Sequence, residues 1–122
     1  MTFTIAAIDH VQLAMPKGEE EKARAFYSGI LGMTELAKPD ALAKRGGAWF
    51  KSGKVQIHLG VEEEFRPAKK AHIALAVRDA APLRSTLSSH GCRVQDDDLI
   101  PGMKRFYTDD CFGNRIEFIE LE

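Results

Sequence analysis

The sequence predicts an α+β protein made of two βαβββ modules, which pair into a curved, partly closed sheet with an internal cleft and helices outside. Three observations support this fold. The order strand, helix and three strands occurs twice, similar side chains recur at offsets of 62 and 59 residues, and the composition is 44% hydrophobic and 29% charged. We expect one domain over residues 1–122, because a chain of this length can bury a single core.

Module one, at about residues 5–61, begins with a strand from Ile8 to Met15, where apolar and polar residues alternate. A helix over residues 19–32 follows, because its apolar residues recur at helical spacing and Gly32 can end it. Three further strands are predicted at residues 33–37 and onward toward 43, at 48–51 and at 54–61.

A polar connection, at about residues 62–70, leads into module two, at about residues 71–122. Its first strand is predicted at residues 71–77. A helix from about Asp79 to His90 follows, with Asp79 as its N-cap and a glycine directly after it. The remaining strands are predicted at residues 93–95, 105–108 and 115–121.

The two modules place metal-capable side chains at matching positions. His10 falls on His72 in the first strands, and His58 falls on Glu117 in the last strands. In the segment GKVQIHLG, His58 alternates with apolar residues and therefore lies on the face away from the core. Pairing the two half-sheets buries a common core, so the opposite strand faces line a cleft into which these four side chains point.

The charge and hydropathy patterns exclude several classes of partner. A formal net charge of -1 and the lack of a basic stripe argue against nucleic-acid binding. No apolar segment approaches the length of a membrane span, and the N-terminus lacks the features of a secretory signal. We therefore expect a cytoplasmic protein that binds neither nucleic acid nor a membrane.

The chain resembles the vicinal oxygen chelate superfamily, also called the glyoxalase, bleomycin-resistance and extradiol-dioxygenase superfamily, over essentially its full length. IDHVQLA and KAHIALAV look like its two first strands, RAFYSGILGM like its helix-to-strand passage, and DDCFGNRIEFIEL like its final turn and strand. The resemblance is to a superfamily and not to one enzyme. It implies a small-molecule substrate and a homodimer, because many two-module members swap modules between subunits.

The resemblance also implies a metal site. In glyoxalase I-like members the ligands come from the first and last strand of each module, and here those positions hold His10, His58, His72 and Glu117. Imidazole and carboxylate together suit a first-row divalent ion, so we expect one Zn, Ni, Fe, Mn or Co ion. Four protein ligands leave two octahedral positions for adjacent substrate oxygens. The sequence leaves open whether one chain or two chains supply the four residues.

His58 departs from the family pattern. Its position is generally a glutamate in glyoxalase I-like enzymes and a glutamine in methylmalonyl-CoA epimerase-like enzymes. A neutral imidazole leaves a divalent site with net positive charge but removes one carboxylate base, which disfavours classical glyoxalase I activity. Extradiol dioxygenase-like members use the positions of His10, His72 and Glu117. His58 can be a fourth ligand or a general base, and Glu117 is the second candidate catalytic residue.

Four further residues are candidate substrate contacts. Arg66 on the connection can bind a carboxylate or phosphate, and Arg105 and Tyr107 share one face of a predicted strand. Trp49 can form a cleft wall. Each also has an ordinary structural interpretation: Arg66 as a solvated loop charge, Trp49 as a packed residue, and Arg105 as an ion-pair partner of Glu117.

These observations favour a metal-dependent enzyme of glyoxalase or dioxygenase type. It would act on a small, oxygen-rich molecule chelated to a divalent metal, in an isomerase, lyase, epimerase or oxygenase step. The alternative is a metal-free protein that binds or sequesters a small molecule, similar to bleomycin-resistance proteins. That class does not need the four ligand positions.

Overall fold

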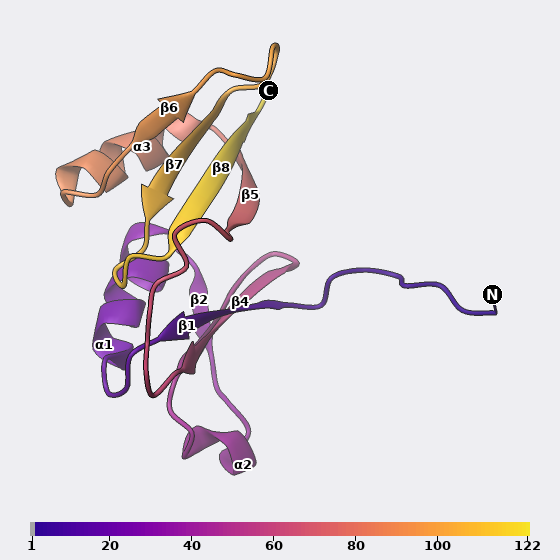
Figure 1. The fold of residues 1–122 in the computed structure, drawn as a ribbon, viewed down its shortest axis with the longest axis vertical. Helices are drawn as coiled ribbons and strands as arrows, with labels where there is room; N and C mark the ends of the chain where they lie inside the picture. Colours follow the sequence, from indigo (N-terminus) through magenta and orange to yellow (C-terminus); the bar gives the residue numbers. More distant parts are fainter. Residues whose placement is uncertain (1) are drawn as a thin grey trace.

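Each half of the chain forms its own four-stranded sheet in the computed structural model, which describes residues 2–122. Figure 1 shows the first half, from indigo to magenta, beside the second half, from red to yellow. Neither sheet closes on itself. The predicted α+β class with two βαβββ repeats is confirmed, whereas the division into modules within a single domain stays a prediction.

The first sheet has the order β1-β4-β3-β2. β1 is parallel to β4, and β3 is antiparallel to β4 and β2. Apolar residues face the core on alternate positions of these strands, with Phe50, Ile57 and Leu59 almost fully buried. The strands are β1 (Val11–Met15), β2 (Thr34–Leu36), β3 (Ala48–Ser52) and β4 (Val55–Val61).

A helical segment connects β1 to β2 and covers the core. It begins as α1 (Glu20–Ala23) and continues without a break as the π-helix η1 (Arg24–Ile30). The wider turn is seen where the Leu31 N–H donates to the Phe26 carbonyl at 2.9 Å, an i to i+5 hydrogen bond. Gly32, with a φ of 71°, ends the segment.

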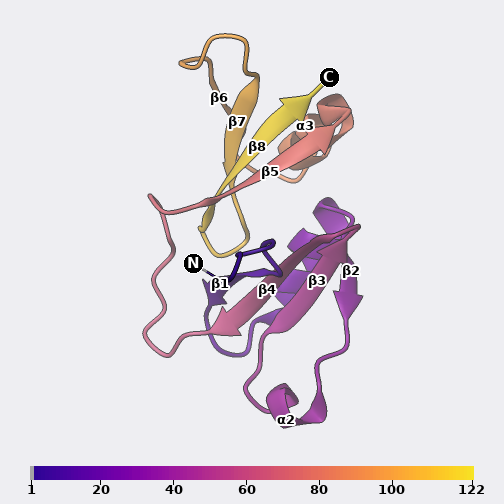
Figure 2. The same cartoon turned by 90° about the vertical axis from the view of Figure 1, so that its right-hand side faces the viewer.

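The second sheet repeats the first, with the order β5-β8-β7-β6. β5 is parallel to β8, and β7 is antiparallel to β8 and β6. The helix α3 (Ala80–Ser89) lies against this sheet (Figure 2). Its Leu87 side chain is fully buried. The strands are β5 (Ile73–Arg78), β6 (Gln95–Asp97), β7 (Arg105–Asp109) and β8 (Arg115–Leu121). Within residues 2–122, no helix is long and apolar enough to cross a membrane.

Two strand predictions were wrong, and one predicted helix cap is present in position only. The strand expected to run toward residue 43 ends at Leu36, and α2 (Asp40–Ala43) follows, because the carbonyl of Pro39 accepts hydrogen bonds that start a helical turn. Asp79 occupies the predicted N-cap position of α3, but its side chain makes no capping hydrogen bond and its φ is 54°. The strand expected at residues 93–95 lies at Gln95–Asp97, where its residues pair with β7.

Every residue from 2 to 10, before β1, is exposed. The predicted strand therefore begins three residues late, at Val11. Figure 1 shows this N-terminal arm extending away from both sheets. Phe3, Ile5 and Ile8 are 66%, 85% and 80% exposed, which is unusual for three large apolar side chains so close in sequence.

Candidate metal site

His10 and His58 come together on the first sheet. His10 immediately precedes β1, and His58 lies in the middle of β4, only 5% exposed. Because β1 and β4 are neighbouring parallel strands, the two rings meet and stack with centroids 4.1 Å apart and planes 14° apart. His10 Nδ1 donates to the Asp9 carboxylate at 2.9 Å, which leaves its Nε2 as the nitrogen able to bind a ligand.

Trp49 covers the other face of His58. The two residues are directly opposite each other in the antiparallel β3–β4 register. Their rings stack with centroids 4.2 Å apart and planes 9° apart. Since β4 lies between β1 and β3, His58 is enclosed between His10 and Trp49. The expected substrate residue Trp49 is therefore a neighbour of the candidate ligand.

The surroundings of His58 favour its neutral form. Burial, followed by the nearby His10, holds the pKa of His58 below its ordinary value. Its Nε2 donates to the Gln56 side-chain oxygen at 3.2 Å, so Nδ1 carries the lone pair. A neutral histidine with one defined free nitrogen can act as either a metal ligand or a general base.

His72 and Glu117 form the equivalent pair on the second sheet. His72 precedes β5, and Glu117 lies in β8, only 5% exposed. His72 Nε2 is 2.9 Å from Glu117 Oε1. On its other side, His72 Nδ1 donates to the Lys70 carbonyl at 2.9 Å. This contact fixes a proton on Nδ1 and turns Nε2 toward the carboxylate.

Arg105 binds the second oxygen of Glu117. Its guanidinium donates to Glu117 Oε2 at 3.2 Å, to the Tyr107 hydroxyl at 3.2 Å, and lies 3.2 Å from Asp97. Burial alone raises the pKa of Glu117, but hydrogen bonds from His72 and Arg105 outweigh it and lower the pKa overall. Glu117 is therefore an anion at neutral pH. Arg105, a candidate substrate contact, therefore makes the ion pair with Glu117 that the sequence offered as its structural interpretation.

The two sheets repeat this arrangement residue by residue. Tyr107 is opposite Glu117 in the β7–β8 register, as Trp49 is opposite His58 in the β3–β4 register. Tyr107 meets His72 edge to face with ring centroids 5.5 Å apart, and the Arg115 guanidinium lies 3.8 Å from its ring centre. Each sheet thus carries one histidine before its first strand, one candidate metal ligand in its last strand and one aromatic residue opposite that ligand.

The structure brings the four candidate ligands together only in pairs. Within residues 2–122 of one chain, no three His, Cys, Asp or Glu side chains are arranged to hold a metal ion. We call the pair His10 and His58 the first half-site, and the pair His72 and Glu117 the second half-site. Assignment of the four residues as ligands stays a prediction.

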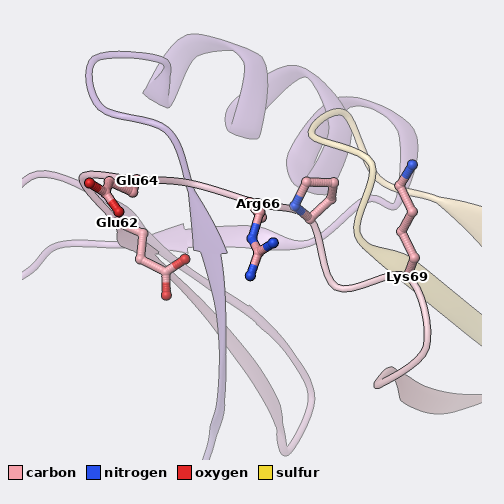
Figure 3. Close-up of a pocket in the computed structure, with 5 residues that line it drawn as sticks. Glu62, Glu64, Arg66 and Lys69 are labelled. Carbon is pink, nitrogen blue, oxygen red and sulfur yellow. The ribbon is translucent and has the colours of Figure 1, made fainter.

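Arg66 lies apart from both half-sites. It is exposed on the connection and lines an open pocket of about 830 Å³ together with Glu62, Glu64, Pro67 and Lys69. Figure 3 shows Arg66 and Glu62 extending to the same side of the connection, whereas Lys69 extends to the other. A pocket with both charges and wide exposure has no marked preference for an anion.

A second open space adjoins His72. A groove of about 520 Å³ runs between β1 and β5, where Gln12, Leu13 and Ile73 line it with His72. β1 and β5 are the edge strands of their sheets. Their outer edges are therefore available to another polypeptide.

A buried polar network joins the two halves. The sequence indicated only a turn at this place. Asp110 accepts a hydrogen bond from Tyr27 at 2.6 Å and further bonds from Phe112 and Asn114. Asn114 in turn donates to the Ala14 carbonyl at 2.9 Å. The clustered Asp, Gly and Asn residues of DDCFGN were the signal, but their partners lie far away in sequence.

The chain belongs to the Glyoxalase/Bleomycin resistance protein/Dioxygenase superfamily, whose profile matches residues 7–118. The two sheets and their strand order agree with this assignment. The resemblance inferred from the sequence is therefore confirmed at the level of the family. No match was found among curated proteins.

Several solved structures share the fold. A glyoxalase family protein from Bacillus anthracis is 51% identical, with complete coverage of both chains and a TM-score of 0.94. The fosfomycin resistance protein FosX from Listeria monocytogenes is 15% identical, covering 98% of this chain and 96% of its own, with a TM-score of 0.78. Lactoylglutathione lyase from Agrobacterium tumefaciens is 18% identical, covering 94% and 93%, with a TM-score of 0.69. The last two similarities concern the fold alone.

Proposed function

We propose that the protein is a metal-dependent enzyme whose site combines the first half-site of one chain with the second half-site of another. The observation that supports this most strongly is the matched pair of half-sites. Each holds two donors at equivalent positions of a repeated sheet, and residues 2–122 of one chain offer no group of three. A second copy can complete both sites of a symmetric dimer.

The chemistry of the donors fits a divalent first-row ion. His10 and His72 both engage Nδ1 with an oxygen, at Asp9 and Lys70, so that Nε2 is the nitrogen for a metal; in His72 the ion would replace the contact of Nε2 with Glu117. Such second contacts commonly orient histidine ligands. Arg105 binds one oxygen of Glu117 and leaves Oε1 beside His72 Nε2. His10, His72 and Glu117, joined by His58 where it does not act as the base, are suitable ligands for Mn, Fe, Co, Ni or Zn.

Exposed surfaces near the half-sites support a homodimer. Both β1 and β5 are edge strands, and His10 and His72 immediately precede them. The N-terminal arm leading to His10 exposes three large apolar residues. Burying such residues against a second copy is favourable, and it would hold His10 in place.

The proposed reaction begins with proton transfer to His58. Bound at this site, a divalent ion would stabilise negative charge on two adjacent substrate oxygens. The lowered pKa of His58 favours its neutral form, so where His10, His72 and Glu117 alone hold the ion, the free Nδ1 of His58 can accept a substrate proton. The rings of His10 and Trp49 keep water from its faces. A positioned base favours isomerisation, epimerisation or elimination over oxygenation.

The substrate class follows from charge. A bound divalent ion with one carboxylate and neutral imidazole ligands leaves net positive charge, and Arg105 and Arg115 lie on the second sheet. A small anion with two adjacent oxygens fits this environment. A variant of Listeria FosX is described in complex with Mn(II) and 1S,2S-dihydroxypropylphosphonic acid. That compound is a suitable first probe.

The first experiment measures metal per chain in protein purified without a histidine tag, before and after incubation with each of the five ions. One ion per chain is expected with at least one metal. Retention near zero under every condition contradicts the proposal.

The two-chain arrangement is tested by mixing two inactive variants. One carries His10→Ala and His58→Ala, and the other carries His72→Ala and Glu117→Ala. Neither binds metal alone, but a mixed dimer contains one intact site. Random exchange should restore about one ion per four chains, because half of the dimers are mixed. No recovery in verified mixed dimers contradicts a site shared between chains.

One observation favours the alternative, a metal-free binding protein similar to bleomycin-resistance proteins. Glu117 is already compensated by Arg105 and His72 without a metal ion. That function predicts that the dihydroxyphosphonate probe, or another small anion, binds equally well with and without a chelator. Binding that needs the added ion supports the enzyme instead.

A further inference from the structure

Trp49 is the only tryptophan of the chain, and its position is not explained by core packing. Its neighbours in β3, Ala48 and Phe50, are 1% and 0% exposed and face the core. Trp49 points to the opposite face and is only partly buried. A large aromatic residue on that face needs a reason other than filling the interior.

Trp49 stacks on the ring of His58. The planes of Trp49, His58 and His10 are nearly parallel, and successive centroids are 4.2 Å and 4.1 Å apart. The rings come from three adjacent strands or their ends, in the order β3, β4 and β1. They therefore form one continuous stack with His58 in the middle.

This stack leaves only the edge of the His58 ring accessible. The lone pair of an imidazole nitrogen lies in the plane of the ring, so a ligand or a proton must approach along that edge. With both faces covered, the ring cannot rotate about its χ2 angle without separating the stack. His10 lies on an otherwise exposed segment, so its ring orientation also depends on His58.

We infer that Trp49 is a positioning residue that holds the ring plane of His58, and through His58 that of His10, for the first half-site. The role of this positioning in metal binding depends on the proposed function, whereas the positioning itself does not. The equivalent residue Tyr107 contacts His72 from its edge in the second sheet. An aromatic residue at this position of the repeat thus contacts a histidine in both halves.

Three proteins test the inference: wild type, Trp49→Phe and Trp49→Leu. The first measurement is the NMR spectrum of the histidine C–H groups at one alkaline pH without metal. The His58→Gln spectrum assigns the His58 signals. In wild type, the indole ring current should move the His58 signals upfield; this shift should be reduced in Trp49→Phe and lost in Trp49→Leu. His90, at the end of α3, is the internal control and should keep its signals in all three proteins.

The second measurement is affinity for Co²⁺ or Mn²⁺ by calorimetry. Trp49→Leu should bind roughly tenfold more weakly, as is usual when a contact that orients a ligand is lost. Trp49→Phe should recover most of this loss because a phenyl ring can still stack. Thermal unfolding should change little, since Trp49 lies outside the core.

The two proposals fail in different ways. Unshifted His58 signals in wild type, or identical signals in Trp49→Leu, overturn the positioning role whether or not metal binds. Unchanged metal affinity in Trp49→Leu overturns its role in the half-site. Absence of metal binding in wild type contradicts the proposed function, and the NMR comparison then decides on the stack by itself.

Discussion

Tyr27 donates a 2.6 Å hydrogen bond to Asp110 across the boundary between the two halves of the chain. Tyr27 belongs to the π-helix of the first half, and Asp110 directly follows β7 in the second. Both side chains are buried, and burial together with Asp110 raises the pKa of Tyr27. The hydroxyl therefore remains a donor over the whole physiological pH range.

Removing this donor should loosen the connection between the halves. Tyr27→Phe keeps the ring and should lower the free energy of unfolding by about 1–3 kcal/mol, the usual cost of leaving a buried acceptor without its donor. Urea unfolding measures the change. Tyr107→Phe is the matched control, because its hydroxyl makes a longer contact within one half, and it should lose less. Equal stability of Tyr27→Phe and wild type would disprove the role of the bond.

Loss of a ligand should affect metal affinity without unfolding the protein. His72→Ala and Glu117→Ala should weaken metal binding by more than about 100-fold, beyond the range of outer contacts. His58→Gln should have a milder effect if His58 acts only as a base. Calorimetry with the best-retained ion measures all three, and circular dichroism verifies folding.

His90→Ala is the control for these substitutions, because His90 lies outside both half-sites. It should bind metal like wild type. Unchanged metal content in both His72→Ala and Glu117→Ala would rule out the ligand assignment.

The ion pair of Glu117 should make stability depend on pH in the metal-free protein. The folded pKa of Glu117 is lowered from its ordinary value of 4.5, so the pair contributes stability above pH 4.5. This contribution is lost as pH falls through the lowered folded value. Glu117→Gln should therefore be less stable than wild type at pH 7, by roughly 1–3 kcal/mol, and the difference should shrink at lower pH.

Chemical unfolding at several pH values, with a chelator present, measures this difference. Glu122→Gln, at the exposed end of the chain, is the control and should show no pH-dependent effect. A Glu117→Gln difference that is constant from pH 7 to pH 3 would contradict the ion-pair explanation.

Gly47 should be intolerant of any side chain. Its φ is 85°, and a Cβ atom there would lie 2.2 Å from the Leu59 carbonyl oxygen. Gly53 has a φ of 57° but nothing within 4 Å of its Cβ position. Gly53→Ala should therefore lose about 1–2 kcal/mol from backbone strain alone. Gly47→Ala should lose at least about 1 kcal/mol more from the clash. Equal losses of stability for the two variants on thermal unfolding would show that β4 shifts away from residue 47 at no cost.

Sequence patterns predicted much of the fold for a clear reason. Alternation of apolar residues and the internal repeat depend on local order, so the two βαβββ units and the strands near Val55 and Arg115 were found. The helix α2 was missed because the turn that starts it depends on backbone hydrogen bonds to the Pro39 carbonyl. The apolar pattern of the sequence does not show these bonds. The π-helical turn likewise leaves no distinct signal in apolar spacing.

The candidate site was predictable only in part. The repeat identified His10, His58, His72 and Glu117 as equivalent residues. The stack of Trp49 on His58 depends on the register between strands, which a single sequence does not define. The separation into half-sites depends on how the two sheets are placed, and that placement rests on contacts such as Tyr27 with Asp110.

The unlike chemistry of the two half-sites has a stereochemical consequence. One offers two imidazoles flanked by an indole, and the other offers an imidazole and a carboxylate flanked by a phenol and guanidinium groups. In the proposed dimer, a molecule held between them meets different surroundings at each end. Such a site should hold an unsymmetrical substrate in one direction only, so the reaction should change the same end of the molecule in every turnover.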